Sequence, residues 1–455
     1  MSEQRPKRGL QAWLNARYGI DPLLDFLRHK EVPLGSHWMG WYFLGGATLF
    51  FFVVQIATGV LLLMYYQAGE ATSYESLRYI VTKVPFGWLV RAVHCWSAHL
   101  MVASLIAHMF STMMLKAYRP PRELTWVSGY ALFVVTLCFG FSGYLLPWNE
   151  LSFFATAVGT DSVKSVPVVG GWLLQVLRGG ADVTINTLYR FFAFHVVVLP
   201  LAAFAVIGVH LLFVQRQGMA PPLGEKAAPR GMRFFPNFFL RDLLLWLGCL
   251  LVLIVLAAYL PYGPNIPGME WDLGKKADPL APAYPGIKPE WYFLWVYQLL
   301  KEFPPHVFGI EGPQLCLLAV SVLLGIWAVV PWLDRNARRD APSPAFTDLG
   351  VAALLFIGFL MLKAWDLGAP AGVADTIRAQ VAARNAAVLV VIVFAAVVVG
   401  RSIAGRRWFT WSATATAHAV LHGIGGVPYL VAGTVSAGAA ALWLAVARLR
   451  EGRQR

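Results

Sequence analysis

Two apolar stretches of the sequence each carry a pair of histidines at almost the same spacing. His94 and His108 are 14 residues apart within residues 87–118, and His195 and His210 are 15 apart within residues 187–217. An ionisable side chain inside so apolar a stretch is costly and usually serves a function. At about 100° per residue, 14 residues fall about 40° short of four helical turns and 15 overshoot by about 60°. Each pair therefore points to roughly one side of its helix.

Two other apolar stretches carry glycines at the matching spacing. Gly45 and Gly59 are 14 residues apart within residues 41–66, and Gly129 and Gly143 are 14 apart within residues 126–148. Glycine weakens a helix interior unless something must approach the backbone closely. Ordinary small-residue packing motifs repeat every four residues, not every 14. At about 1.5 Å per residue, the members of each pair lie about 21 Å apart along the helix.

That separation suits two flat cofactors, one near each face of a membrane core about 30 Å thick. Imidazole is an axial ligand of heme iron, so we predict two non-covalent hemes b with two histidines each. Both histidine helices run in the same direction across the membrane. His94 and His195 are therefore expected to share one heme, and His108 and His210 the other. Arg91, three residues before His94, is a candidate partner for a heme propionate.

Composition places the chain in a membrane class. Of its 455 residues, 58% are hydrophobic and 13% are charged, whereas a soluble domain is about one quarter charged. The net charge of +13 is interpreted as loop charge that sets topology, with no nucleic-acid partner. The four cysteines stand singly, so no disulfide framework, zinc ribbon or covalent c-type heme motif is indicated.

The sequence predicts an all-α polytopic membrane protein with a four-helix dihaem bundle, a three-helix C-terminal part and one or two extra helices. The expected organisation along the chain is a basic lead-in that could lie on the membrane surface (1–36), the four-helix bundle (37–216), a linker (217–241), the three-helix part (242–366) and a C-terminal extension (367–455). Basic residues gather near the N-terminus and in 116–122, 216–241 and 335–339. The positive-inside rule puts these segments on the cytoplasmic side, here called the negative side.

Several motifs resemble those of one known family, the cytochrome b subunits of the quinol:cytochrome c oxidoreductases. They are GYLLPWNELSFFA at 143–155, PEWYF at 289–293 and PWLDR at 331–335, together with the histidine and glycine sets. The resemblance covers about residues 30–366. The motifs PRELTWVSG at 121–129 and VPVVGGWLLQVLRGG at 166–180 are similar to the chloroplast-type branch, as is the 15-residue histidine spacing. In that branch the two parts are usually separate proteins, and here they look fused.

The resemblance implies that quinol is oxidised at the positive side, between GYLLPW and the PEWYF loop. Glu290 would accept a quinol proton, since desolvation suits a carboxylate to that task. Tyr292 would be its hydrogen-bond partner, and Pro289, Trp291 and Tyr144 would line the quinol site. Electrons would then cross through both hemes to a quinone site at the negative side, completing a Q cycle that contributes to a proton gradient.

At the negative side, Asp242 with Arg241 beside it matches the basic–acidic pair that the family uses near quinone. The chloroplast-type chain carries a cysteine in its first span that holds an extra heme covalently. Phe43 stands at the matching position, so no such heme is expected. PWNE at 147–150 replaces the more usual PWG or PWD followed by Gln.

The chain holds no iron–sulfur or c-type heme motif, so the resemblance implies a Rieske protein and a c-type cytochrome as partners. It also implies a homodimer in the lipid of a bacterial inner membrane, with the N-terminus in the cytoplasm. The alternative function is that of a dihaem membrane anchor of a quinone-linked dehydrogenase. His99 is interpreted as a loop or helix-surface residue. His418 and His422 have a metal-ligand spacing but no third ligand, which favours simple helix polarity.

Overall fold

The computed structural model describes residues 9–22, 25, 30–33, 39–166, 168–221, 223, 231–259, 273–283, 287–307 and 309–364. The C-terminal extension predicted for 367–455 lies outside the described residues. His418 and His422 lie outside them as well.

The fold is helical, as the sequence predicted. Five helical segments in the described residues are long and apolar enough to cross a membrane: Gly40–Leu63, Gly87–Met114, Glu123–Leu145, Ile185–Gln217 and Phe234–Tyr259. These segments contain α3 (Leu44–Leu63), α5 (Gly87–Met114), α6 (Glu123–Leu145), α9 (Ile185–Ala193), α10 (Leu199–Gln217) and α11 (Phe239–Tyr259). Two further apolar helices follow, α13 (Gly312–Ala328) and α16 (Pro344–Ala364).

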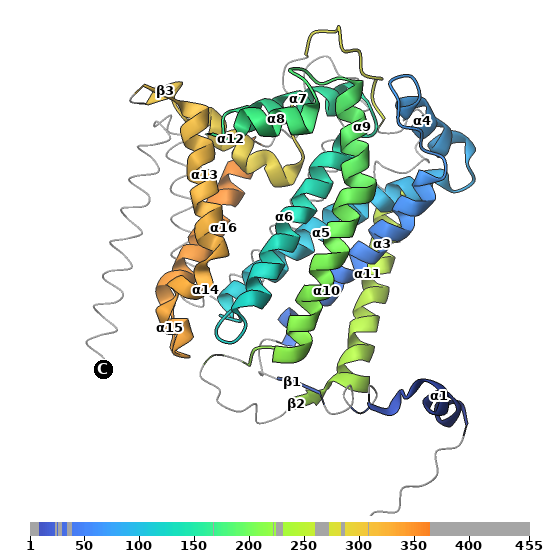
Figure 1. Cartoon of the computed structure of the whole chain (residues 1–455), viewed down its shortest axis with the longest axis vertical. Helices are drawn as coiled ribbons and strands as arrows, with labels where there is room; N and C mark the ends of the chain where they lie inside the picture. The colour runs from blue at the N-terminus through green and yellow to red at the C-terminus, as the bar shows by residue number, and fades with distance from the viewer. Residues whose placement is uncertain are drawn as a thin grey trace, which may run out of the picture.

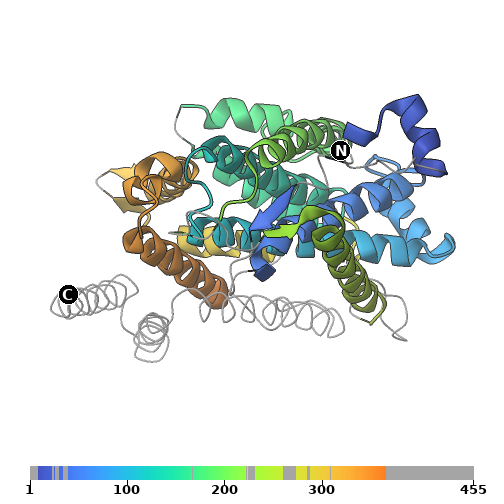
Figure 2. The ribbon, with the colours of Figure 1, turned by 90° about the horizontal axis from the view of Figure 1, so that it is seen from below.

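The four-helix group forms two tight pairs, α3 with α5 and α6 with α10. The C-terminal helices pack around it at separate places: α11 against α3 and α5, α13 against α6, and α16 against α5. Figure 2 shows α11 well apart from α13 and α16 on the rim of this group. One buried cluster joins the four-helix group to the C-terminal part of the chain. It contains Trp96 of α5, Leu253 of α11, Met361 of α16, and Trp291 from the turn before α12.

The fifth span begins earlier than residue 242, where the sequence placed it. A kinked segment at Phe234–Phe238, in which Phe235 has an extended backbone, leads into α11 at Phe239. The charged pair Arg241–Asp242 therefore lies inside the first turns of the helix, and the Asp242 carboxylate lies against Gly46 of α3. The strand β2 (Gly231–Arg233) precedes this segment and pairs with β1 (Glu31–Pro33), which ties the lead-in to the linker.

Short helices gather at the two ends of the bundle. Figure 1 shows α4 (Ser73–Lys83), α7 (Glu150–Lys164) and α8 (Gly170–Arg178) at the upper end, with α12 (Leu294–Glu302) and the strands β3 (His306–Val307) and β4 (Ile310–Glu311). At the lower end are α1 (Leu10–Tyr18), the β1–β2 pair and the helices α14 (Val330–Leu333) and α15 (Arg335–Arg338). Among the described residues, the elements that carry the basic segments predicted to share one side lie at this lower end: α1, β2, α15 and the loop after α5.

The unusual PWNE sequence has a structural task at the upper end. The Asn149 side chain caps α7 by accepting a hydrogen bond from the Ser152 backbone N–H at 2.8 Å. Its Nδ2 donates to the Leu273 carbonyl at 2.8 Å, and the Glu150 N–H donates to the Lys275 carbonyl at 2.8 Å. Asn149 therefore both starts α7 and fastens the loop that precedes the PEWYF motif.

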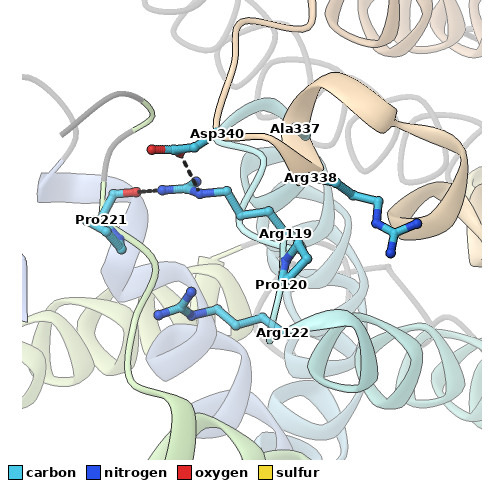
Figure 3. A pocket seen from close by; sticks show the side chains of 7 residues that line it. All are labelled: Arg119, Pro120, Arg122, Pro221, Ala337, Arg338 and Asp340. Carbon is cyan, nitrogen blue, oxygen red and sulfur yellow. Dashed lines mark hydrogen bonds and ion pairs between the residues drawn. The ribbon is translucent and has the colours of Figure 1, made fainter. Parts of the chain in front are cut away.

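Two arginines clasp the start of the linker at the lower end (Figure 3). Arg119 donates to the Pro221 carbonyl at 2.6 Å and forms an ion pair with Asp340 at 3.1 Å. Arg122 donates to the carbonyls of Gly218 and Gln217, each at 3.0 Å. Arg119 therefore joins three parts of the chain: the loop after α5, the linker, and the loop after α15.

A buried carboxylate lies close to these arginine contacts. Asp334 is 1% exposed and accepts hydrogen bonds from the Tyr118 hydroxyl at 2.7 Å, the Ser343 hydroxyl at 2.7 Å and the Ala337 N–H at 3.1 Å. Burial and the bond to Asp334 raise the pKa of Tyr118. Burial lowers the pKa of Lys116 to about 8, against the opposing attraction of Asp334 and Asp348. The carboxylate thus binds the loop after α5 to the α14–α16 region.

Asp334→Ala is expected to destabilise the protein by about 3 kcal/mol or more, since removing one partner of a buried charged network leaves the other members unsatisfied. The measurement is the temperature of half-unfolding of the purified protein in detergent. Glu75→Ala is the matched control, because its ion pair with Arg78 has both side chains exposed, at 45% and 62%, and exposed ion pairs contribute little. Equal shifts in the two variants would contradict this account of Asp334.

Candidate functional site

Each of the four candidate histidines lies against one of the four candidate glycines. A methyl group added at Gly45 would lie 3.2 Å from Cε1 of His108, and one at Gly59 would lie 3.4 Å from Cε1 of His94. On the other helix pair, a methyl group at Gly129 would lie 3.2 Å from Cε1 of His210, and one at Gly143 would lie 2.6 Å from Cε1 of His195. The glycines thus let the helix backbones approach the imidazoles.

A hydroxyl group just before the glycine holds three of these rings. Thr58 Oγ1 lies 2.8 Å from Nδ1 of His94, and Ser142 Oγ lies 3.1 Å from Nδ1 of His195. Ser128 Oγ lies 2.9 Å from Nδ1 of His210. When Nδ1 donates to a hydroxyl, the ring is oriented and the Nε2 lone pair remains for a metal. This donor set fits axial ligation of heme iron.

The fourth ring differs. Leu44 precedes Gly45 and carries no hydroxyl, and Nδ1 of His108 is buried without a hydrogen-bond partner among the described residues. The four rings therefore share the glycine contact, while only three share the hydroxyl contact.

The unequal histidine spacing has a local cause. The turn Phe194–Val198 between α9 and α10 is widened, with hydrogen bonds five residues apart, and it contains His195. Such a turn accommodates one extra residue within a helix. The 15 residues from His195 to His210 therefore span the same turns as the 14 from His94 to His108.

The predicted pairing of histidines is the one that the structure brings together. The ring centroids of His94 and His195 are 6.5 Å apart, and His108 and His210 are close enough to interact electrostatically. Arg91 is 6% exposed and its charge reaches His94. A buried guanidinium is costly unless an anion is close, so Arg91 suits a propionate at this end of the bundle.

The PEWYF loop lies on α6, close to the first histidine pair. A methyl group at Gly140 would lie 2.5 Å from the Tyr292 hydroxyl oxygen, so only glycine leaves room for this side chain. Phe293 packs edge-on against Phe141 with ring centroids 6.1 Å apart. Gly140 is one helical turn before Gly143, where the His195 ring lies. Tyr144 is the next residue along, and it is half-buried.

The other residues of the predicted quinol site have distinct environments. Trp291 is 6% exposed and Tyr292 is 8% exposed, and both belong to the buried cluster that joins the two parts. Pro289 and Glu290 are half-buried at the start of the turn Trp291–Phe293. His99 was expected at a helix surface, which is wrong: it is 8% exposed and accepts a hydrogen bond from the Trp291 indole.

At the opposite end, Asp242 lies beside the second histidine pair. A methyl group at Gly46 would lie within 2.7 Å of Oδ1, Oδ2 and Cγ of Asp242, and Gly46 follows the glycine that contacts His108. Asp242 Oδ1 is buried without a hydrogen-bond partner among the described residues. Arg241 is exposed and lies next to it in the chain.

Phe43 has an aromatic partner in the C-terminal part. Its ring stacks on Phe238 with centroids 4.5 Å apart and planes 8° apart. A phenyl ring cannot form a covalent bond to a heme vinyl group as a cysteine can. That no covalently held heme occurs at this position stays a prediction.

Some contacts were not foreseen from the sequence. They involve the hydroxyls of Thr58, Ser128 and Ser142, the glycine at 140 and the imidazole of His99. The three hydroxyl residues each stand immediately before a candidate glycine. This repeated hydroxyl–glycine pattern is visible in the sequence and could have predicted their contacts with the histidines. Gly140 and His99 matter through contacts with a loop about 150 to 190 residues away, and no local pattern marks them.

Fold and site together define a helical membrane protein with two pairs of facing histidines. Comparison with known proteins shows to which family this membrane protein belongs. The family model described as cytochrome b/b6/petB matches residues 29–218, and the one described as cytochrome b(C-terminal)/b6/petD matches residues 276–390. The chain therefore belongs to the cytochrome b family, integral membrane proteins that bind heme b, interact with quinone and form the oxidoreductase core of quinol-oxidising complexes.

Individual relatives agree with this assignment. The chain is 46% identical to the cytochrome b subunit of a cytochrome bc complex from Chlorobaculum thiosulfatiphilum, over 76% of this chain and 78% of that protein. It is 41% identical to cytochrome b6 of Emiliania huxleyi over 46% of this chain and 97% of that protein. A solved chain of a hyperthermophilic respiratory complex III superposes with a TM-score of 0.66 at 25% identity, covering 86% of this chain and 98% of that chain.

Thr58→Val is expected to lower heme retention by about 10-fold, because loss of the group that orients a metal ligand typically costs 10- to 100-fold in affinity. The measurement is the heme remaining per chain after incubation with a heme-scavenging apoprotein. Thr48→Val, on the same helix, is the control: its hydroxyl bonds the Leu44 carbonyl and Ser104 rather than a histidine. If both variants keep heme equally well, the hydroxyl does not serve the ligand.

Proposed function

We propose that this chain oxidises quinol at the end of the bundle formed by α7, α8 and the PEWYF loop, the positive side. One observation carries the proposal: Tyr292 packs on Gly140, one turn from Gly143 and the His195 ring. A quinol held by the loop at 289–293 would therefore lie close to the histidine pair of that side. The N-terminal and C-terminal parts each contribute one wall.

The loop supplies the groups that quinol oxidation needs. Oxidation of a quinol to a quinone releases two protons and two electrons. Glu290 is half-buried between Pro289 and the buried Trp291, so its carboxylate can accept a proton from the quinol and release it toward the surface. We propose that the Tyr292 hydroxyl hydrogen-bonds the same substrate, and its position against Gly140 supports this role.

We propose that His94 and His195 ligate one heme b and that His108 and His210 ligate the other. When bound, two such hemes supply one-electron acceptors at two depths of the membrane. The chain contributes the orientation of the ligands through Thr58, Ser142 and Ser128. It also contributes a buried cation, Arg91, which can neutralise a propionate.

A second quinone site at the negative side is proposed around Asp242. Its carboxylate lies against Gly46, next to the glycine that contacts His108. An acid there can deliver protons from the adjacent aqueous phase to a quinone that is being reduced. Arg241, exposed beside it, would keep the local charge balanced. Together the two sites would carry out a Q cycle.

The partner subunits and the membrane orientation that we propose are those of the same family. A chain of this kind requires an iron–sulfur protein and a c-type cytochrome to receive electrons, and we propose a Rieske protein and a c-type cytochrome as partners within a homodimer. The basic segments at the lower end favour that end as the cytoplasmic face of a bacterial inner membrane. A dihaem anchor of a dehydrogenase is the less favoured alternative, because the family match extends through the C-terminal part to residue 390.

Glu290→Gln is expected to reduce quinol oxidation by about 100-fold or more, which is the usual contribution of a positioned general base. The measurement is quinol-dependent reduction of the acceptor by the purified complex, with heme content per chain measured alongside. Glu311→Gln, an exposed acid in the same half of the chain, is the matched control and should retain full activity. Unchanged activity in Glu290→Gln, with hemes intact, would contradict the proposed role.

A further inference from the structure

The helix α5 has a second functional face, opposite the one that carries the heme ligands. His99 follows His94 by five residues, which at about 100° per residue places it about 140° around the helix. It therefore faces the C-terminal part rather than the interior of the four-helix group. The side chain is 8% exposed, and its ring lies edge-on to Trp96 with centroids 5.9 Å apart.

Trp291, from the loop that holds Glu290 and Tyr292, is attached to this face. The Trp291 indole N–H donates to Nδ1 of His99 at 3.2 Å, across 192 residues of sequence. The Trp291 ring is also edge-on to Tyr292, with centroids 5.4 Å apart. A tryptophan N–H is a donor only and, when buried, requires an acceptor. His99 supplies this acceptor on the helix that also carries His94.

The bond specifies the form of the imidazole. Nδ1 can accept from the indole only when it carries no proton, so the ring is neutral and its proton lies on Nε2. The Trp291 indole N–H therefore fixes His99 in the tautomer that carries its proton on Nε2. This bond fixes the distance between α5 and the loop at a residue directly beside Glu290.

We propose that His99 is a positioning residue for quinol oxidation, which holds Trp291 and thereby sets Glu290 and Tyr292 at their working distance from the heme helix. This inference rests on the function proposed for the loop. His99 touches neither substrate nor cofactor in this role. Loss of the acceptor would leave the indole N–H buried and unsatisfied, so the loop would move to find another partner. A shift of about 1 Å at a catalytic group can cost about 100-fold in rate.

The test compares four variants of the intact complex: His99→Leu, His99→Asn, Trp291→Phe and His99→Leu with Trp291→Phe. The probe is a reduced short-chain quinol, and kcat and KM are measured together with heme content. His99→Leu and Trp291→Phe should each lower kcat about 10-fold or more. The double variant should be no worse than either single variant, since both changes break the same bond.

His99→Asn provides the rescue, because the Asn Oδ1 can accept from the indole at nearly the position of Nδ1. It should restore kcat to within about threefold of the unmodified chain. Should His99→Leu fail to assemble, a low kcat in Trp291→Phe beside a near-normal kcat in His99→Asn supports the proposal. Independent, additive losses in the two single variants would overturn it, as would an unchanged kcat in Trp291→Phe.

Glu290→Gln separates this proposal from the function on which it rests. If Glu290→Gln is inactive and His99→Leu is fully active, only the positioning role is overturned. If Glu290→Gln is fully active, the proposed quinol chemistry of the loop fails, whatever the His99 variants do.

Discussion

The close approach of helix backbones to four imidazoles is the constraint on which the rest of the structure depends. A side chain larger than hydrogen at Gly143 would overlap the His195 ring, with a methyl group only 2.6 Å from Cε1. Glycine tolerates that contact but weakens the helix that carries it. The surrounding packing of α3 with α5 and of α6 with α10 must therefore hold the helices in register. The hydroxyls that precede the glycines then orient three of the rings.

The C-terminal part completes the site by its position against this bundle. Its loop reaches α6 through Tyr292 at Gly140, and it reaches α5 through Trp291 at His99. Asp242 reaches α3 at Gly46 at the other end. Contacts between the two parts thus occur at both proposed quinone sites. At the lower end, the Arg119–Asp340 ion pair and the Tyr118–Asp334 hydrogen bond fasten the same two parts outside the apolar layer.

Much of this arrangement could be predicted from the sequence because it repeats. The spacing of His94 and His108 and of Gly45 and Gly59 encodes height and helix face directly. The pairing of rings followed from this geometry together with the common direction of the two histidine helices across the membrane. The 15-residue spacing was less transparent, because a widened turn at His195 absorbs the extra residue. The start of α11 was misplaced for a different reason. The charges of Arg241 and Asp242 suggested a helix end, but α11 begins before them, at Phe239, and Asp242 lies against Gly46. His99 was misjudged because its partner lies 192 residues away.

The most direct test of the central claim is the heme content and redox behaviour of the purified protein. The account predicts two hemes b per chain, released by acid acetone, low-spin in both oxidation states and titrating at two separable potentials. A single heme, a high-spin heme with an open axial position, or a heme that resists extraction would contradict the assignment of the four histidines as two axial pairs.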